Sequence, residues 1–196
     1  MEKLQQQLDF ILELDRLKAV YRQTRVKPDS NRRENSAEHS WHISLLAEVL
    51  AEYAEEPVDI QRVVRMLLIH DVVEIDAGDT FAFADQEELD GQEDKEIEAA
   101  NRLFGLLPEE QFIPMRDLWL EFEAAQTADA RFAKAMDRML PILQNMANQG
   151  GTWEAHNVSK TQVIQRNQYL KGLAPKLWDY ALQQIDLAVS NGWLKE

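Results

Sequence analysis

The chain has 196 residues, which is enough for one domain with a sizeable core and short for two independent domains. Apolar residues make up 45% of it and charged residues 29%, a composition that argues against intrinsic disorder, collagen-like repeats and a coiled-coil rod. The net charge of −14, without any basic stripe, argues against long nucleic acid as a partner. The lack of cysteine excludes disulfides, a thiol nucleophile and thiolate metal sites.

Glycine and proline are sparse, at 7 and 6 residues, which favours long helices joined by few tight turns. No stretch alternates apolar and polar residues over a useful length, so we expect an all-α fold in a single domain over 1–196. The N-terminal stretch has no apolar h-region, and nowhere do about 18 apolar residues follow one another. We therefore expect a cytoplasmic protein without a membrane partner.

The first elements are predicted from helical spacing and capping signals. Apolar residues recur with a helical period over about 2–24, where we expect the first helix. A second helix is expected over about 35–54, because Asn35 and Glu38 have the spacing of a capping box. Pro57 suits the first turn of a third helix.

Later helices are expected at about 92–104, 108–124, 128–148 and 158–190, with a loop at 148–151. The acidic stretch 85–98 is expected to form a solvated loop and helix edge. Pro141 lies inside the predicted helix 128–148, four residues after Asp137. It either kinks one helix beside Asp137 or begins a second helix, and the sequence favours neither.

The third helix carries the strongest apolar stripe in the chain, and this stripe ends on charged residues. Its apolar members are Ile60, Val63, Val64, Leu67 and Leu68. Asp71 occupies the next stripe position, His70 stands beside it, and Glu74 follows one helical turn later. Burying such groups is unfavourable unless a partner compensates them, and a divalent cation does so strongly.

A single histidine on an apolar face is more often a hydrogen-bonded core residue than a metal ligand. Here, however, His70 and Asp71 are adjacent at the end of a buried stripe, Glu74 lies one turn on, and His39 stands in the preceding helix. This combination predicts a metal site built from imidazoles and carboxylates.

Several strings, in this order along the chain, resemble the HD-domain metal-dependent phosphohydrolases, and more narrowly their 5′-deoxynucleotidase-like branch. The strings are Leu17–Arg22, Arg33–His39, His70-Asp71-Val72-Val73-Glu74, Gly78-Asp79-Thr80 and Lys134-Ala135-Met136-Asp137. The resemblance covers a motif-bearing core of about 15–145, to which the C-terminal helices of about 158–190 are added. It implies a helical HD-domain fold and a homodimer.

The resemblance also implies that His39, His70, Asp71 and Asp137 hold one divalent ion, for which Mn, Co, Fe, Zn and Mg are all candidates. His42 is a rival first ligand. Because it continues a packing face of its helix, we interpret it as structural.

For catalysis, the resemblance implies that Glu74 does acid–base work beside Asp71. Asp79 would contact the sugar hydroxyl, Arg22 the phosphate, and Lys18 or Lys134 would assist Arg22. Four of these residues have an ordinary alternative. Glu74 and Lys134 could be solvated helix residues, Asp79 could cap a turn, and Arg22 could pair with a neighbouring acid.

The relatives carry tryptophan after this arginine, whereas this chain has Gln23, so the packing of the nucleoside is a point of difference. The function implied is metal-dependent hydrolysis of (deoxy)nucleoside 5′-monophosphates, small phosphomonoesters, by a metal-activated water. Two alternatives stay open: another HD-type nucleotide phosphohydrolase, and a helical module that senses nucleotides through a slow metal site.

Overall fold

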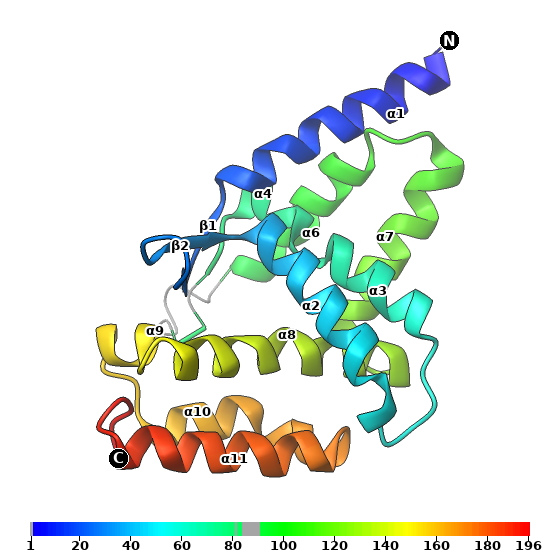
Figure 1. Cartoon of the computed structure of the whole chain (residues 1–196). Coiled ribbons are helices and arrows are strands. Elements are labelled where there is room, and N and C mark those ends of the chain that lie inside the picture. Colours follow the sequence, from blue (N-terminus) through cyan, green and yellow to red (C-terminus); the bar gives the residue numbers. More distant parts are fainter. Residues whose placement is uncertain (1, 81, 84–90) are drawn as a thin grey trace.

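The computed structural model describes residues 2–80, 82–83 and 91–196, and in this part the chain is helical with one short β-hairpin (Figure 1). The predicted helical class is therefore confirmed. The α-helices are α1 (Glu2–Glu13), α2 (Ser36–Leu50), α3 (Ile60–Ile69), α4 (Glu74–Ala77), α6 (Gln92–Phe104), α7 (Glu109–Ala124), α8 (Ala128–Ala147), α9 (Gly151–Ala155), α10 (Lys160–Asn167) and α11 (Pro175–Ser190). Short 3-10 helices cover Leu14–Ala19, Ala51–Tyr53, His70–Val73 and Gln168–Gly172, and the strands are β1 (Tyr21–Val26) and β2 (Arg32–Asn35).

The N-terminal segment differs from the single helix predicted over 2–24. The helix α1 ends at Glu13, a 3-10 helix follows, and β1 pairs antiparallel with β2. This pairing buries Thr24, whose hydroxyl donates a 2.8 Å hydrogen bond to Glu34 Oε2. Helical spacing cannot reveal such a partner on a second strand, which explains why the hairpin was missed.

The start of α2 agrees with the prediction, and the start of α3 does not. The Asn35 side chain accepts a hydrogen bond from the Glu38 amide, and Glu38 accepts one from the Asn35 amide, which completes the predicted capping box. Helix α3 begins at Ile60 rather than near Pro57. Its first turn is capped by Asp59, which accepts bonds from two amides of that turn.

Helix α8 is a single helix with Pro141 inside it, so the alternative of two helices meeting there is wrong. The loop predicted at 148–151 is present, but it leads directly into the short helix α9, which the sequence did not predict. Of the acidic stretch 85–98, residues 85–90 lie outside the described part, and α6 begins at Gln92.

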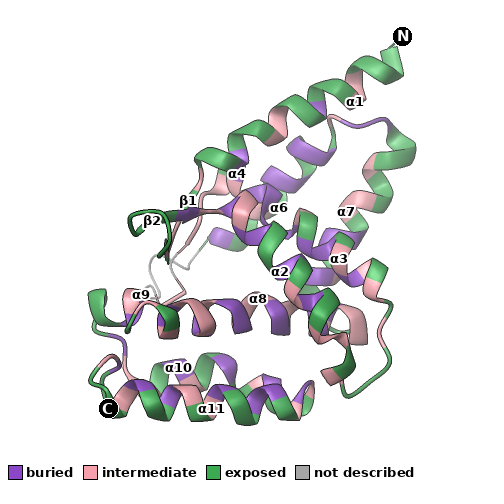
Figure 2. Cartoon of the chain, viewed as in Figure 1, coloured by how far each residue is buried: buried purple, intermediate pink, exposed green. Residues whose placement is uncertain are grey.

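Two buried clusters form the core, shown in purple in Figure 2. The larger cluster gathers around α8 with α2, α3, α10 and α11, and the smaller one joins α6 to the N-terminal segment and to Val72 and Val73. His70 and Asp71 lie between the end of α3, in the larger cluster, and these valines, so the charged strings fall where the two clusters meet. No helix in the described ranges has the length and apolar character needed to cross a bilayer.

Candidate metal centre and adjoining cavity

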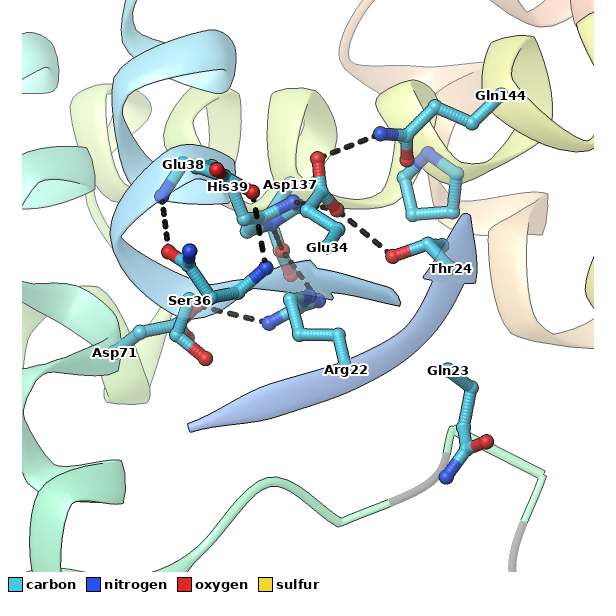
Figure 3. Close-up of polar contacts among 12 residues, drawn as sticks. Arg22, Gln23, Thr24, Glu34, Ser36, Glu38, His39, Asp71, Asp137 and Gln144 are labelled. Atoms are coloured by element: carbon cyan, nitrogen blue, oxygen red, sulfur yellow. Dashed lines mark hydrogen bonds and ion pairs between the residues drawn. The ribbon is translucent and has the colours of Figure 1, made fainter. Parts of the chain in front are cut away.

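Three predicted ligands from distant parts of the chain converge in one place, and Figure 3 shows two of them, His39 and Asp137. His39 comes from α2, His70 from the 3-10 helix after α3, and Asp137 from α8, and one ligand atom of each lies within 4.8 Å of the others. Asp137 Oδ1 is 2.9 Å from His39 Nε2 and 3.7 Å from His70 Nε2. This spacing is that of donors able to share one small cation.

The orientation of His70 is set by its own backbone surroundings. Its Nδ1 donates to the Leu67 carbonyl at 2.8 Å, and the indole of Trp119 donates to the His70 carbonyl at 3.2 Å. Nε2 is then left facing Asp71 Oδ1 at 2.9 Å, yet it is buried without a hydrogen-bond partner among the described residues. A buried imidazole lone pair beside carboxylate oxygens suits a divalent ion, and this arrangement is where Asp71 would join the set.

The pKa values show how strongly the centre favours positive charge. Burial lowers the pKa of His70, but the charges of Asp71 and Asp137 outweigh it and raise that pKa to about 10. Burial opposes ionisation of Asp137, yet the hydrogen bond with His39 and the nearby imidazole of His70 hold the pKa of its carboxyl well below the usual range. The anionic surroundings therefore bind a proton at His70 where a metal ion would compete for the same lone pair.

Arg22, on β1, lies among the carboxylates of the centre. Its Nη1 donates to Asp71 Oδ2 at 2.8 Å and is 3.8 Å from Glu74 and 3.7 Å from Asp79, while its Nη2 is 4.0 Å from Asp137. The hairpin that the sequence did not predict thus places the predicted arginine. We name the set His39, His70, Asp71, Glu74, Asp79 and Asp137, with Arg22, the charged centre.

Glu74 and Asp79 complete the charged centre on the side of α4. Burial, and then the charge of Asp71, raise the pKa of Glu74 well above its ordinary value, and Ser36 donates a hydrogen bond to its Oε2. Burial also raises the pKa of Asp79. Gly78, with φ of 78°, makes the predicted tight turn that turns the chain after α4 and presents Asp79.

Glu34 belongs to the site, although the sequence predicted no role for it. Glu34, on β2, is 2% exposed, and its Oε2 lies 3.5 Å from His39 Nδ1. Thr24 donates to the same oxygen, and Gln144 donates to Oε1 at 2.6 Å. A carboxylate behind a ligand histidine orients the ring and makes it more basic. The only local signal was its place five residues before His39.

Other predicted residues lie elsewhere. Lys18 pairs with Asp15 at 2.5 Å on the surface, and Lys134 pairs with Glu123 at 2.8 Å. Neither lines the cavity described below, so their phosphate contacts stay predictions. His42 is exposed next to the Trp41 ring, so the packing role predicted for it is wrong, because the core side of α2 carries Ile43 and Ala47 instead.

A cavity adjoins the charged centre and has an empty volume of about 700 Å³, including space open to solvent. Arg22, Asp79 and Asp137 form part of its lining. The remaining lining comes largely from α8, α9 and α10, and we name the part formed by Arg138, Ile142, Trp153, Val163 and Arg166 the helical wall. Pockets of this size hold small-molecule ligands.

Comparison with known proteins places the chain among relatives. The model of the HD domain matches residues 14–178. Curated relatives named 5′-deoxynucleotidase HDDC2 are 31% identical in Homo sapiens and 32% in Bos taurus, each over 137 residues that cover 70% of this chain and 65% of the relative. The matched part therefore spans less than two thirds of these relatives.

Two solved structures share the fold. The crystal structure of a "Predicted metal-dependent phosphohydrolase" from Magnetospirillum magnetotacticum MS-1 is 49% identical, with a TM-score of 0.93 over 100% of this chain and 97% of its own. A conserved hypothetical protein from Pyrococcus furiosus, 20% identical with a TM-score of 0.51 over 82% of this chain and 94% of its own, shows the fold alone. Because the family model matches most of its length, the chain belongs to the HD domain family.

Proposed function

We propose that this chain is a metal-dependent phosphomonoesterase that hydrolyses (deoxy)nucleoside 5′-monophosphates to nucleoside and phosphate. The observation that carries the proposal is the convergence of His39, His70 and Asp137, with the buried Nε2 of His70 2.9 Å from Asp71 Oδ1, beside a cavity that Asp79 and Asp137 line. The names of the HDDC2 relatives and of the Magnetospirillum structure support the same chemistry.

The metal would be held by His39, His70, Asp137 and Asp71, a mixed imidazole and carboxylate set that suits a divalent transition ion. When bound, such an ion supplies Lewis-acid chemistry, polarising the phosphoryl group and acidifying water. The chain itself contributes the orientation of these donors. Leu67 orients His70 through its carbonyl, and Glu34 lies behind His39.

Glu74 is the general acid in this proposal. A nucleoside alkoxide is a poor leaving group, so its oxygen must receive a proton as the ester bond breaks. Burial and the nearby charge of Asp71 favour the protonated form of Glu74, and the Ser36 hydroxyl orients the carboxyl group. A raised pKa makes a carboxyl group better suited to hold a proton and deliver it to that oxygen.

In this proposal Arg22 contacts the phosphate and Asp79 contacts the sugar. Arg22 ties Asp71 to the other carboxylates, so it holds the acidic groups of the centre in one geometry. Asp79, which follows the turn at Gly78 and lines the cavity, accepts a hydrogen bond from the sugar 3′-hydroxyl. We expect 2′-deoxy substrates to react faster than their ribo counterparts, because a 2′-hydroxyl would have little room beside this contact.

The test is a screen of the purified protein against deoxy- and ribonucleoside 5′-monophosphates and simple phosphomonoesters, with Mg²⁺, Mn²⁺, Co²⁺ or Zn²⁺ added. We expect phosphate release from the deoxynucleotides with at least one transition ion, and none after chelation. The His70→Ala variant is the control for contaminating phosphatases. Release that is equal in the variant, or absent with every metal, would overturn the proposal.

A homodimer is the second part of the proposal, and it rests on the family resemblance alone. Sedimentation velocity over a range of protein concentrations tests it. A species of twice the mass of the 22.7 kDa chain is expected.

A further inference from the structure

Arg138 and Arg166 of the helical wall each donate a hydrogen bond to a backbone carbonyl rather than to a carboxylate. Arg138, on α8, donates from Nη1 to the Arg166 carbonyl at 2.6 Å, and its guanidinium lies 4.4 Å from the centre of the Tyr169 ring. Arg166, on α10, donates from Nη1 to the Ala82 carbonyl at 3.1 Å. Among the described residues, no carboxylate lies within ion-pair distance of either guanidinium.

A guanidinium offers five N–H donors in a planar fork and accepts none. Each of these arginines spends one nitrogen on a backbone carbonyl, which orients the group and leaves further donors for the cavity that both residues line. Desolvation of the guanidinium by nearby protein atoms, and then the charge of Arg138, lower the pKa of Arg166 from its ordinary value. The residue as a whole is nevertheless exposed. Among the described residues, two cations thus stand near each other without a carboxylate at ion-pair distance, and Asp137, further away, acts on the pKa of Arg166 in the opposite direction to Arg138.

The other basic residues considered for the phosphate are already committed. The charge of Arg22 faces four carboxyl groups, with the closest contact, 2.8 Å, to Asp71. Figure 3 shows the contact between Arg22 and Asp71. Lys134 is bound to Glu123 and lies over the Phe122 ring, and Lys18 is bound to Asp15. Of these three residues, only Arg22 lines the cavity, and its charge is shared among four carboxyl groups.

The balance of charges in the charged centre also points to the arginines of the helical wall as ligands for an anion. The charged centre holds four carboxyl groups, against which Arg22 supplies one positive charge and a divalent ion would supply two. Nothing is then left over for a phosphate dianion, and Glu34 adds a further buried negative charge nearby. A dianion at this centre needs two more positive charges within reach, and Arg138 directly follows the ligand Asp137 in α8.

We propose that Arg138 and Arg166 form an anion subsite of the cavity that binds the phosphate group of the substrate. The subsite deepens the function proposed above and rests on it for the identity of the substrate. Two guanidinium forks contact the phosphoryl oxygens from the helical wall, while the charged centre contacts them from the opposite side. This geometry places charge-assisted hydrogen bonds where negative charge accumulates during phosphoryl transfer.

The experiment measures binding of inorganic phosphate to the metal-loaded protein by calorimetry, together with KM and kcat for a deoxynucleoside 5′-monophosphate. Arg138→Gln and Arg166→Gln should each weaken phosphate binding and raise KM by about 10- to 100-fold, the range for losing a hydrogen bond to a charged group. Arg166→Lys should recover part of the loss. Metal content should stay unchanged, and the exposed Arg65→Gln on α3 is the matched control.

Unchanged phosphate affinity in both glutamine variants with retained metal would overturn the subsite. So would a loss confined to substrates that carry a second phosphate, because the arginines would then bind a group other than the one released. If the wild-type protein hydrolyses no mononucleotide but its phosphate binding still depends on both arginines, the subsite stands and the proposed function fails. Measuring binding apart from turnover keeps the two failures distinguishable.

Discussion

The charged centre and the helical wall face the same cavity, but they treat charge in opposite ways. In the centre, every carboxyl group lies close to a cation or to an imidazole, and Arg22 alone is within 4.0 Å of four of them. On the helical wall, Arg138 and Arg166 rest on backbone carbonyls and aromatic rings. The centre is therefore arranged to keep a small cation, and the wall is arranged to receive an anion that arrives and leaves.

This difference has an energetic consequence. Buried carboxylates are costly to desolvate, so the centre is a place where the fold gives up stability for metal affinity. The helical wall is partly open to solvent, so its charged groups reduce the stability of the fold less. Substitutions in the centre should consequently change metal content, proton transfer and folding, whereas substitutions on the wall should change ligand affinity alone.

The largest effect is expected from His70→Ala. Removing the imidazole leaves Asp71 and Asp137 without the donor that lies between them, so metal and phosphatase activity should both fall to background. Elemental analysis and circular dichroism check that the metal is lost while the protein stays helical. His42→Ala, on the exposed side of α2, should keep its metal. Stoichiometric metal in the His70 variant would remove this residue from the centre.

Glu74→Gln should separate proton transfer from metal binding. The amide keeps a hydrogen bond to Ser36 but cannot donate the acidic proton, so metal should remain bound while kcat falls by about 10²- to 10⁴-fold. With 4-nitrophenyl phosphate, whose leaving group needs no proton, the loss should be much smaller. Asp76→Asn on α4, which pairs with Arg102 and lies 3.7 Å from Arg16, is the control. An equal loss on both substrates would argue against an acid role.

Glu34→Gln should weaken metal binding, although Glu34 is not itself a predicted ligand. The buried carboxylate accepts from Thr24 and Gln144 and lies behind His39, and an amide in its place must turn a donor toward one of them. We expect metal affinity to fall by about 10- to 100-fold, as is typical for partners of ligand histidines. Competition with a chelating dye measures the change. Glu38→Gln, four residues on and paired with Arg32, should leave the affinity as it was.

Asp79→Ala tests where the sugar lies. If its carboxylate accepts the 3′-hydroxyl bond, the wild-type kcat/KM should be about tenfold or more higher for a 2′-deoxy substrate than for the 2′,3′-dideoxy analogue. The substitution should abolish that ratio. A ratio that survives in the variant would leave Asp79 as a residue of the turn after Gly78.

The sequence predicted part of the charged centre but not the arginines of the helical wall. The apolar stripe of α3 and the adjacent His70 and Asp71 lie within one segment, so local spacing pointed to them. The role of Glu34 depends on strand pairing and on Gln144, which is 110 residues away. The arginines of the wall depend on α10 packing against α8, because Arg138 reaches the backbone 28 residues further along. Such partners leave no local pattern, and the hairpin that carries Arg22 was mistaken for helix for the same reason.

The smallest effect is expected at Glu96, a carboxyl group near the charged centre that is not a predicted metal ligand. It tests how much an ionised, partly buried carboxylate lowers the stability of the fold. Burial raises the pKa of Glu96, on α6, and Gln92 donates to its Oε1 at 3.0 Å. Because the folded-state pKa lies above the unfolded value, the folded protein binds this proton more tightly. The associated stability is present at pH below the unfolded pKa and is lost as the pH rises through the folded one.

At pH 7 the ionised Glu96 is therefore destabilising, and Glu96→Gln, which keeps the acceptor for Gln92, should raise the melting temperature by about one to a few degrees. The gain should shrink as the pH falls toward 4, where the wild-type carboxyl group takes up its proton. Thermal melts at both pH values measure it, with the exposed Glu98→Gln on the same helix as the matched control. A gain that is the same at both pH values would mean that desolvation of the charge is not its cause.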